Sequence, residues 1–121
     1  MNLINRSTTQ AVVAEAISDS IIINNEQDAN RILEEIFAIG ARNIILHKKN
    51  IAQEFFDLKT GLAGAVLQKF VTYNIQVAIV GDFTNITSKP LNAFIFESNR
   101  GNQIFFLESL DLAIQKLSMV V

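Results

Sequence analysis

The sequence predicts an α/β fold, a single domain with a mixed sheet whose core strands are parallel and are joined by crossover helices. Apolar runs of strand length alternate with amphipathic stretches of helix length along most of the chain. The run at residues 75–81 is almost continuously apolar, which is typical of a parallel strand covered on both faces. The 121 residues contain no repeat, low-complexity tract or linker, so we expect one domain over residues 1–121.

Two β-rich runs lie in the first part of the chain. Residues 11–17 and residues 20–23 consist mostly of Val, Ile and Ala, and Ser18 and Asp19 separate them. High β-propensity on either side of a polar break predicts two short strands or one bent strand.

A helix is predicted from Glu26 to Ile39. Asparagines at 24–25 can cap it, Glu26 and Asp28 place negative charge in its first turn, and Gly40 supplies a stop. The side chains expected on its buried face are Ala29, Ile32, Leu33, Ile36 and Phe37.

The middle of the chain predicts a strand, a loop, a helix and a second strand. We expect the first strand at residues 43–47 and the loop at residues 48–56. The helix ends near residues 73–74, and the next strand covers residues 75–81. This order requires a crossover connection, which is right-handed in parallel sheets.

The start of this helix combines two glycines, Gly61 and Gly64, with Lys59. Its N-cap is Asp57, or Thr60 if the helix begins later. Each glycine in a helix interior costs about 1 kcal/mol relative to alanine, which suggests a close backbone approach. The approaching group is either a neighbouring strand or helix, or an anion or partner chain at the helix N-terminus. The apolar positions of the helix are Leu58, Leu62, Ala63, Val66, Leu67, Phe70 and Val71.

The C-terminal part predicts a helix, a strand and a final helix. Ser88 caps the first helix, Pro90 lies in its first turn, and Gly101 ends it. The last strand covers residues 103–107, and Ser109 caps the final helix. The inward side chains are Leu91, Phe94, Ile95 and Ser98 in the first helix, and Leu110, Ala113, Ile114 and Leu117 in the last.

Phe94 and Phe96 cannot both face the core, because two positions along a helix differ by about 200°. Phe96 is therefore a candidate interface residue. Hydrophobic residues make up 50% of the chain and the mean hydropathy is +0.29, which is high for a small soluble domain. We expect a homodimer.

Charge and composition exclude several classes of protein. The net charge is −2, the isoelectric point is near 5.3, and the Lys and Arg residues are scattered, which argues against nucleic-acid and membrane partners. There is no Cys and one His, so thiolate chemistry is impossible and metal sites have few ligands. No apolar run approaches the length of a membrane span. We expect a cytoplasmic protein without cofactor or metal.

Polar residues follow the predicted strands, at the edge where parallel α/β sheets bind ligands. The candidate interaction or ligand site consists of Asp57, Lys59, Thr60, Gly61, Gly64 and Asp82. His47 ends a strand, where we expect the backbone to satisfy its ring. No Gly-x-Ser-x-Gly turn occurs, so no catalytic residue is predicted.

The order of elements resembles the STAS domain of anti-sigma-factor antagonists. A strand ending near His47 leads through a polar loop to the helix start at Asp57-Leu58-Lys59-Thr60-Gly61-Leu62, and then to the strand at residues 77–81. In that family a partner kinase phosphorylates the Ser before the Gly of this loop. The resemblance assigns that position to Thr60, where a phosphate would lie at a helix N-terminus beside Lys59.

Longer strings resemble a family of small bacterial proteins known only as a domain of unknown function. They are residues 56–64, residues 67–70, residues 78–83 and residues 94–101, and the resemblance extends over nearly the whole chain. This resemblance implies a fold and a bacterial origin, without an activity.

The leading hypothesis is a non-enzymatic, STAS-like protein-interaction or regulatory module. The alternative is a small-molecule or anion-binding domain at the helix start near Thr60-Gly61, with help from Lys48, Lys49 or Lys59. An enzyme is the third possibility. A pocket of several hundred Å³ converging on Asp57, Thr60 and Asp82 would favour the alternative, and a filled edge with a flat apolar patch would favour the interaction module.

Overall fold

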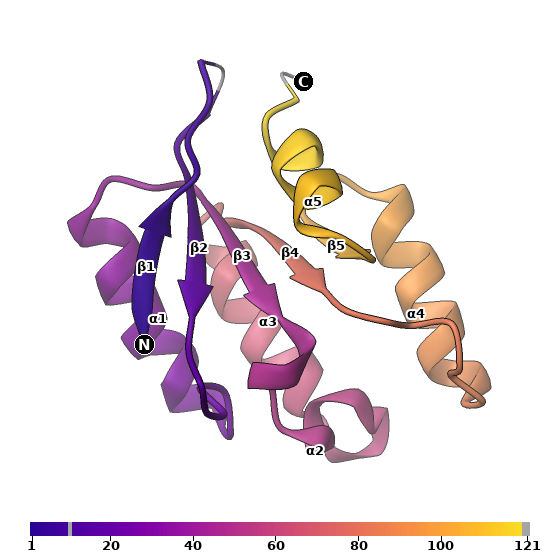
Figure 1. Ribbon diagram of the computed structural model, residues 1–121. Coiled ribbons are helices and arrows are strands. Elements are labelled where there is room, and N and C mark those ends of the chain that lie inside the picture. The colour runs from indigo at the N-terminus through magenta and orange to yellow at the C-terminus, as the bar shows by residue number, and fades with distance from the viewer. Residues whose placement is uncertain (10, 120–121) are drawn as a thin grey trace.

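The computed structural model describes residues 1–9 and 11–119 (Figure 1). The strands of this part form one five-stranded mixed sheet whose spatial order follows the chain, from β1 to β5. Strand β1 runs antiparallel to β2, and β2, β3, β4 and β5 are parallel neighbours. The predicted α/β fold with a parallel core is therefore confirmed. The strands are β1 (Asn2–Asn5), β2 (Val13–Ile17), β3 (Asn43–His47), β4 (Gln76–Val80) and β5 (Ile104–Leu107).

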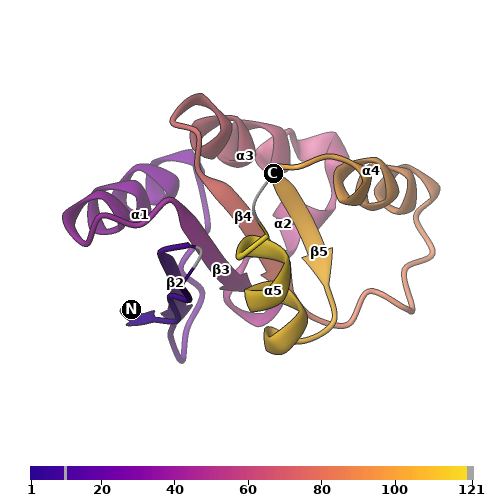
Figure 2. The ribbon, with the colours of Figure 1, turned by 90° about the horizontal axis from the view of Figure 1, so that it is seen from above.

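The helices cover the two faces of the sheet unequally. Helices α1, α3 and α4 lie on one face, and α5 lies on the other (Figure 2). Because the parallel strands follow one another without reversal, crossovers of a single hand place all the connecting helices on the same side. The helices are α1 (Glu26–Ala38), α2 (Gln53–Phe56), α3 (Leu62–Thr72), α4 (Lys89–Arg100) and α5 (Leu110–Leu117), with short 3₁₀ turns η1 (Lys48–Asn50) and η2 (Leu58–Thr60).

Alternating strand residues build a core on each face. The larger core joins inward residues of the strands, such as Ile44 and Ile79, to Ile36 of α1 and Phe70 of α3. The smaller core lies under α5 and consists of Val13, Ile45, Ala78, Val80, Phe105, Ala113 and Leu117. Helix α5 contacts β3, β4 and β5, so the β1–β2 part of this face has less helical cover.

The predicted strand at residues 20–23 is wrong. Ile23 makes one parallel bridge to Ile51, and the backbone N–H groups of Ile22 and Ile23 both donate to the carbonyl of Asn50. The place beside β2 is taken by β1, which the sequence pattern did not reveal. In this segment Ile23 is fully buried, whereas Ile21 is 40% exposed.

Helix α1 agrees with the prediction except at its last turn. The Asn25 side chain accepts a hydrogen bond from the backbone N–H of Asp28, and Gly40 has a φ of +71° beyond the helix end. Phe37 was expected to be buried, but it is 50% exposed. Its ring packs edge-to-face against Tyr73, with 5.6 Å between the centroids.

The two C-terminal helices are confirmed. Ser88 caps α4 through Leu91, and Ser109 caps α5 through Leu112. The predicted inward side chains of both helices are buried or half-buried. No helix in the described part of the chain is long and apolar enough to span a bilayer.

Candidate functional site

Two open hollows lie side by side at the carboxyl ends of β2, β3 and β4. Their volumes are about 850 Å³ and about 530 Å³. We call them together the edge groove. Lys48, Gln53, Glu54 and Phe56 line both hollows; His47, Lys49 and Asp82 lie at the first, and Asp57, Ile86 and Leu91 at the second.

Lys48 is held firmly in the middle of the edge groove. Its ammonium donates to the carbonyl of Asp82 at 2.6 Å. The same nitrogen lies 5.1 Å from the ring centroid of Phe83 and 5.9 Å from that of Phe56, within the range of cation–π attraction. Its stem crosses Gly81, where an added Cβ would lie 2.5 Å from the Lys48 Cβ. The lack of a side chain at Gly81 therefore allows this path.

Asp82 presents an ionised carboxylate at the rim. Its Oδ1 accepts hydrogen bonds from the Thr84 hydroxyl at 2.6 Å and from the Thr84 backbone N–H at 2.9 Å. The hydrogen bond from the Thr84 side chain has the largest effect on the pKa of Asp82, followed by the one from the Thr84 backbone. Both hold this pKa below its ordinary value of 3.8, and the charge of Lys48 lowers it further. The Asp82 carboxylate is therefore negatively charged at neutral pH.

Asp57 and Thr60 form a turn between α2 and α3. The Asp57 carboxylate accepts from the backbone N–H of Lys59 at 3.3 Å. The Thr60 hydroxyl lies 2.6 Å from the carbonyl of Glu54 and 2.9 Å from that of Asp57, and it accepts from the N–H of Leu62. Thr60 therefore ties the start of α3 to the end of α2.

The expectation that a neighbouring strand or helix approaches Gly61 and Gly64 closely is wrong. Gly61 precedes α3 and has a φ of +76°, a conformation that favours glycine in a turn. Gly64 lies exposed within α3, and an added Cβ at either glycine would meet no atom within 4 Å. Nothing in the structure explains why position 64 is glycine.

The structure brings only part of the predicted site together. Asp57 and Asp82 line the two hollows of the edge groove, whereas Lys59, Thr60, Gly61 and Gly64 line neither. Phe96 lies on α4 and is 62% exposed, as its helical position predicts. The Arg100 guanidinium lies 5.7 Å from the centroid of the Phe96 ring.

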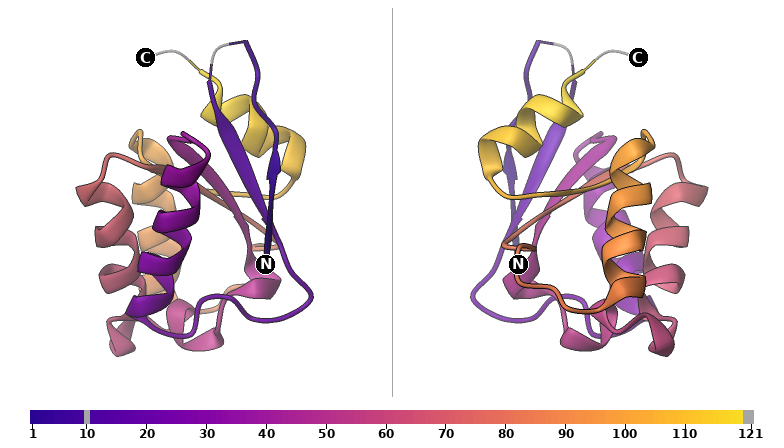
Figure 3. Two further views of the ribbon diagram at one scale, coloured as in Figure 1. Left: turned by 90° about the vertical axis from the view of Figure 1, so that its left-hand side faces the viewer. Right: turned by 90° about the vertical axis from the view of Figure 1, so that its right-hand side faces the viewer.

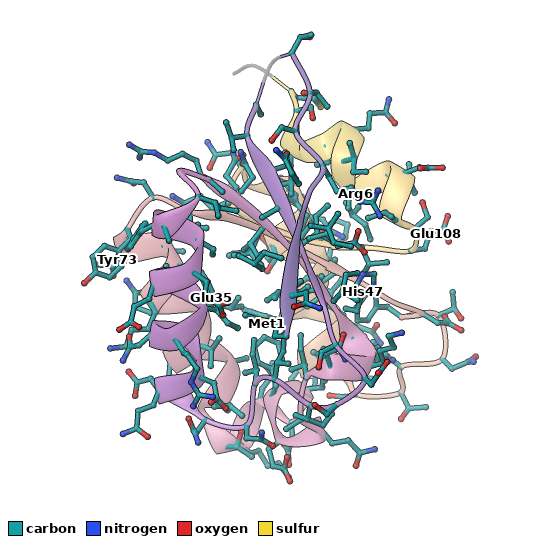
Figure 4. All side chains as sticks on the ribbon, turned by 60° about the vertical axis from the view of Figure 1, so that its left-hand side comes forward. Met1, Arg6, Glu35, His47, Tyr73 and Glu108 are labelled. Carbon is teal, nitrogen blue, oxygen red and sulfur yellow. The ribbon has the colours of Figure 1, made fainter. Side chains whose placement is uncertain are left out.

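A buried carboxylate that the sequence analysis missed lies behind His47. Glu15 is 2% exposed, and its two oxygens contact different partners. Oε2 lies 2.6 Å from the His47 Nε2, and Oε1 accepts from the Arg6 Nε at 2.9 Å. The expectation that the backbone satisfies His47 is therefore wrong. Figure 4 shows Arg6 and His47 on the side of the sheet that carries α5.

The signal for this contact was the charge of Glu15 within an apolar run. A carboxylate at the centre of a buried strand is almost always paired. The described part of the chain holds no cluster of three or more His, Asp or Glu residues suited to a metal ion.

Comparison with known proteins yields one family. A family model described as "Domain of unknown function (DUF4180)" matches residues 8–117. No curated protein and no solved structure matches the chain.

Proposed function

The chain belongs to this family of unknown function, and we propose that it is a non-enzymatic protein-interaction module that binds a segment of a partner protein in the edge groove. The proposal includes a regulatory role, a STAS-like topology and a place in the bacterial cytoplasm. Binding in the groove, the central part of the proposal, rests on one observation: the two hollows are contiguous and open along the same edge.

The edge of the sheet is hollowed, so the filled edge with a flat apolar patch that the sequence criterion required for an interaction module is not found. The criterion for a ligand pocket is met in part, because Asp57 and Asp82 line the hollows and Thr60 lines neither. The shape of the edge groove nevertheless favours an elongated occupant. A pocket for a small molecule usually buries most of its ligand's surface. Here Lys48, Gln53, Glu54 and Phe56 form a shared floor between two open hollows. An extended segment of a partner protein can lie along both hollows at once, whereas a compact ligand would fill only one.

The chemistry of the edge groove resembles that of a protein interface. Apolar side chains of Phe56, Ile86 and Leu91 lie beside polar ones. Lys49 and Asp82 place opposite charges at the rim, and apolar centres with polar rims are typical of interfaces. We infer a partner segment with an apolar anchor between Phe56 and Leu91.

The turn at Thr60 offers a means of regulation. Its hydroxyl bonds to the carbonyls of Glu54 and Asp57, both of which belong to edge-groove residues. A phosphate on Thr60 would remove this donor and place negative charge against two carbonyl oxygens. In this proposal phosphorylation changes the groove by opening the turn.

The experiment that tests the proposal uses site-specific photo-crosslinking in cells. A photoreactive residue replaces Gln53 in the edge groove or, as a control, Gln68 on the exposed side of α3. We expect one defined partner to crosslink at position 53 and not at position 68, and Ile86→Asp to reduce this crosslink. The same crosslinks from both positions, or none from position 53, would contradict the proposal.

A second candidate is binding of a small anion. The first hollow has the volume of a ligand site, and Lys49 lies exposed at its rim. The test is an NMR titration with inorganic phosphate. Shifts at Lys49 and Gly81 would place the anion in the hollow, and shifts at Gly61 and Leu62 would place it at the start of α3. Unchanged spectra would reject this candidate.

A further inference from the structure

The two edges of the sheet differ in how their backbone groups are protected. At the β5 edge, the side-chain amide of Asn99 donates to the carbonyl of Phe106 at 3.1 Å and accepts from its N–H at 2.7 Å. The amide of Asn99 thus takes the place of a neighbouring strand. Such protection prevents edge-to-edge association.

No side-chain amide of the described residues protects the β1 edge in this way. Strand β1 pairs with β2 alone, and its register is uninterrupted from Asn2 to Asn5. In the left view of Figure 3 the β1 edge faces the viewer, and no helix crosses it. Alternate N–H and C=O groups of an edge strand point away from the sheet and can accept another strand.

The sequence of β1 carries none of the residues that usually discourage pairing. Asn2-Leu3-Ile4-Asn5 contains no charge and no proline. Ile4 within β1 is 38% exposed, and Met1 before it and Ile17 on β2 are 39% and 36% exposed. The edge therefore offers free hydrogen-bonding groups together with apolar side chains.

We propose that a second copy of the chain pairs with this edge, β1 against β1 in antiparallel orientation, so that one sheet continues through both copies. A two-fold axis places each residue of β1 opposite a residue of the same strand. A charged β1 would then meet its own charge, whereas the uncharged β1 does not. This self-compatibility argues for a second copy rather than for another protein.

Two registers satisfy the pairing. Paired residues of antiparallel strands point to the same face of the sheet. Leu3 points to the larger core and Ile4, paired with Glu15, points to the opposite face. At the two-fold axis a residue must therefore pair with its own copy, because its sequence neighbour points to the opposite face. In the middle of β1 this residue is either Leu3 or Ile4. Phe96, the interface residue expected from the sequence, lies outside this contact and is the competing candidate.

Disulfide trapping tests the pairing directly, because the chain contains no cysteine. Ile4→Cys reports the register centred on Ile4, and the double variant Asn2→Cys, Ile4→Cys reports the register centred on Leu3. We expect one of them to form a covalent dimer on mild oxidation, and Phe96→Cys to remain monomeric. A dimer from Phe96→Cys alone would overturn the proposal.

Sedimentation measures the same association without a crosslink. Ile4→Lys should raise the dimer dissociation constant about tenfold or more. The two lysines lie directly opposite each other in the register centred on Ile4 and are diagonal neighbours on the same face in the register centred on Leu3, so like charges repel in both. Phe96→Lys is the matched control and should leave the constant unchanged, and melting temperatures confirm that both variants fold. A monomeric parent protein at about 100 µM, far above a micromolar Kd, would overturn the proposal. The test of the edge groove measures crosslinking at position 53 and does not involve β1. Failure of the dimer proposal can therefore be told apart from failure of the proposed function.

Discussion

Glu15 contacts both Arg6, which follows the outer strand β1, and His47, which lines the edge groove. Its carboxylate is buried between Arg6, which is 39% exposed at the side chain, and His47, which is 20% exposed. A buried carboxylate is stable only where its oxygens are paired, because the low-dielectric interior replaces none of the lost hydration. The contact therefore fixes the ends of β1 and β3 relative to β2.

At the residue scale, Arg6→Met should lower the free energy of unfolding by about 2 kcal/mol, because it leaves one oxygen of buried Glu15 without its partner. Adding Glu15→Met should recover part of this loss, since apolar replacement of a buried pair is often nearly neutral. The measurement is chemical denaturation of the single and double variants.

The control is Arg100→Met. Arg100 and Glu97 form an exposed pair at 3.7 Å, so its loss should change stability by less than about 0.5 kcal/mol. If Arg6→Met lowers the free energy of unfolding no more than Arg100→Met does, Arg6 does not stabilise the buried Glu15 carboxylate.

At the element scale, two glycines near the start of α3 look alike in the sequence but differ in backbone conformation. Gly61 ends the η2 turn with a positive φ, and Gly64 has ordinary helical surroundings. Glycine is favoured at a positive φ because other residues crowd their Cβ there. Within a helix it is unfavourable because of its backbone entropy.

Alanine substitutions should therefore have opposite effects. Gly61→Ala should destabilise the protein by about 1 kcal/mol, since its φ is strained for alanine. Gly64→Ala should stabilise it by up to about 1 kcal/mol, because the added Cβ meets no atom and favours the helix. Thermal denaturation of both variants measures this difference, and a loss of stability in Gly64→Ala would show a contact at that face of α3.

At the scale of the whole molecule, the faces of the sheet are covered by unequal numbers of helices. Helices α1, α3 and α4 pack on one face, and the eight-residue helix α5 packs on the other. Within α5, Ala113 and Leu117 are the buried side chains. Elements with few buried contacts open locally at lower free energy than the central core.

Helix α5 should therefore open before the centre of the sheet. We expect its amide hydrogens to exchange roughly tenfold faster, or more, than those of β4, which is paired on both sides. Native-state hydrogen exchange followed by NMR measures both elements in one sample. Equal protection of α5 and β4 would show that α5 opens only with global unfolding.

Part of the edge groove was predictable from the sequence. Lys48, Lys49 and Asp82 follow predicted parallel strands, and the carboxyl ends of such strands meet at one edge. Asp57 joins them because α2 carries the chain back toward that edge. The distance of Thr60 from the groove was not predictable, because it depends on the η2 turn and on the bond to Glu54.

The sequence by itself determined α1, α3, α4, α5 and the parallel strands, because apolar periodicity and capping residues act over a few neighbouring positions. Only the tertiary structure decided that Asn2–Asn5 is a strand and that residues 20–23 are not, since both depend on which segment lies beside β2. It also decided the pairing of Glu15 with His47, which are 32 positions apart. Contacts between distant residues follow from strand order and packing, which local patterns do not encode.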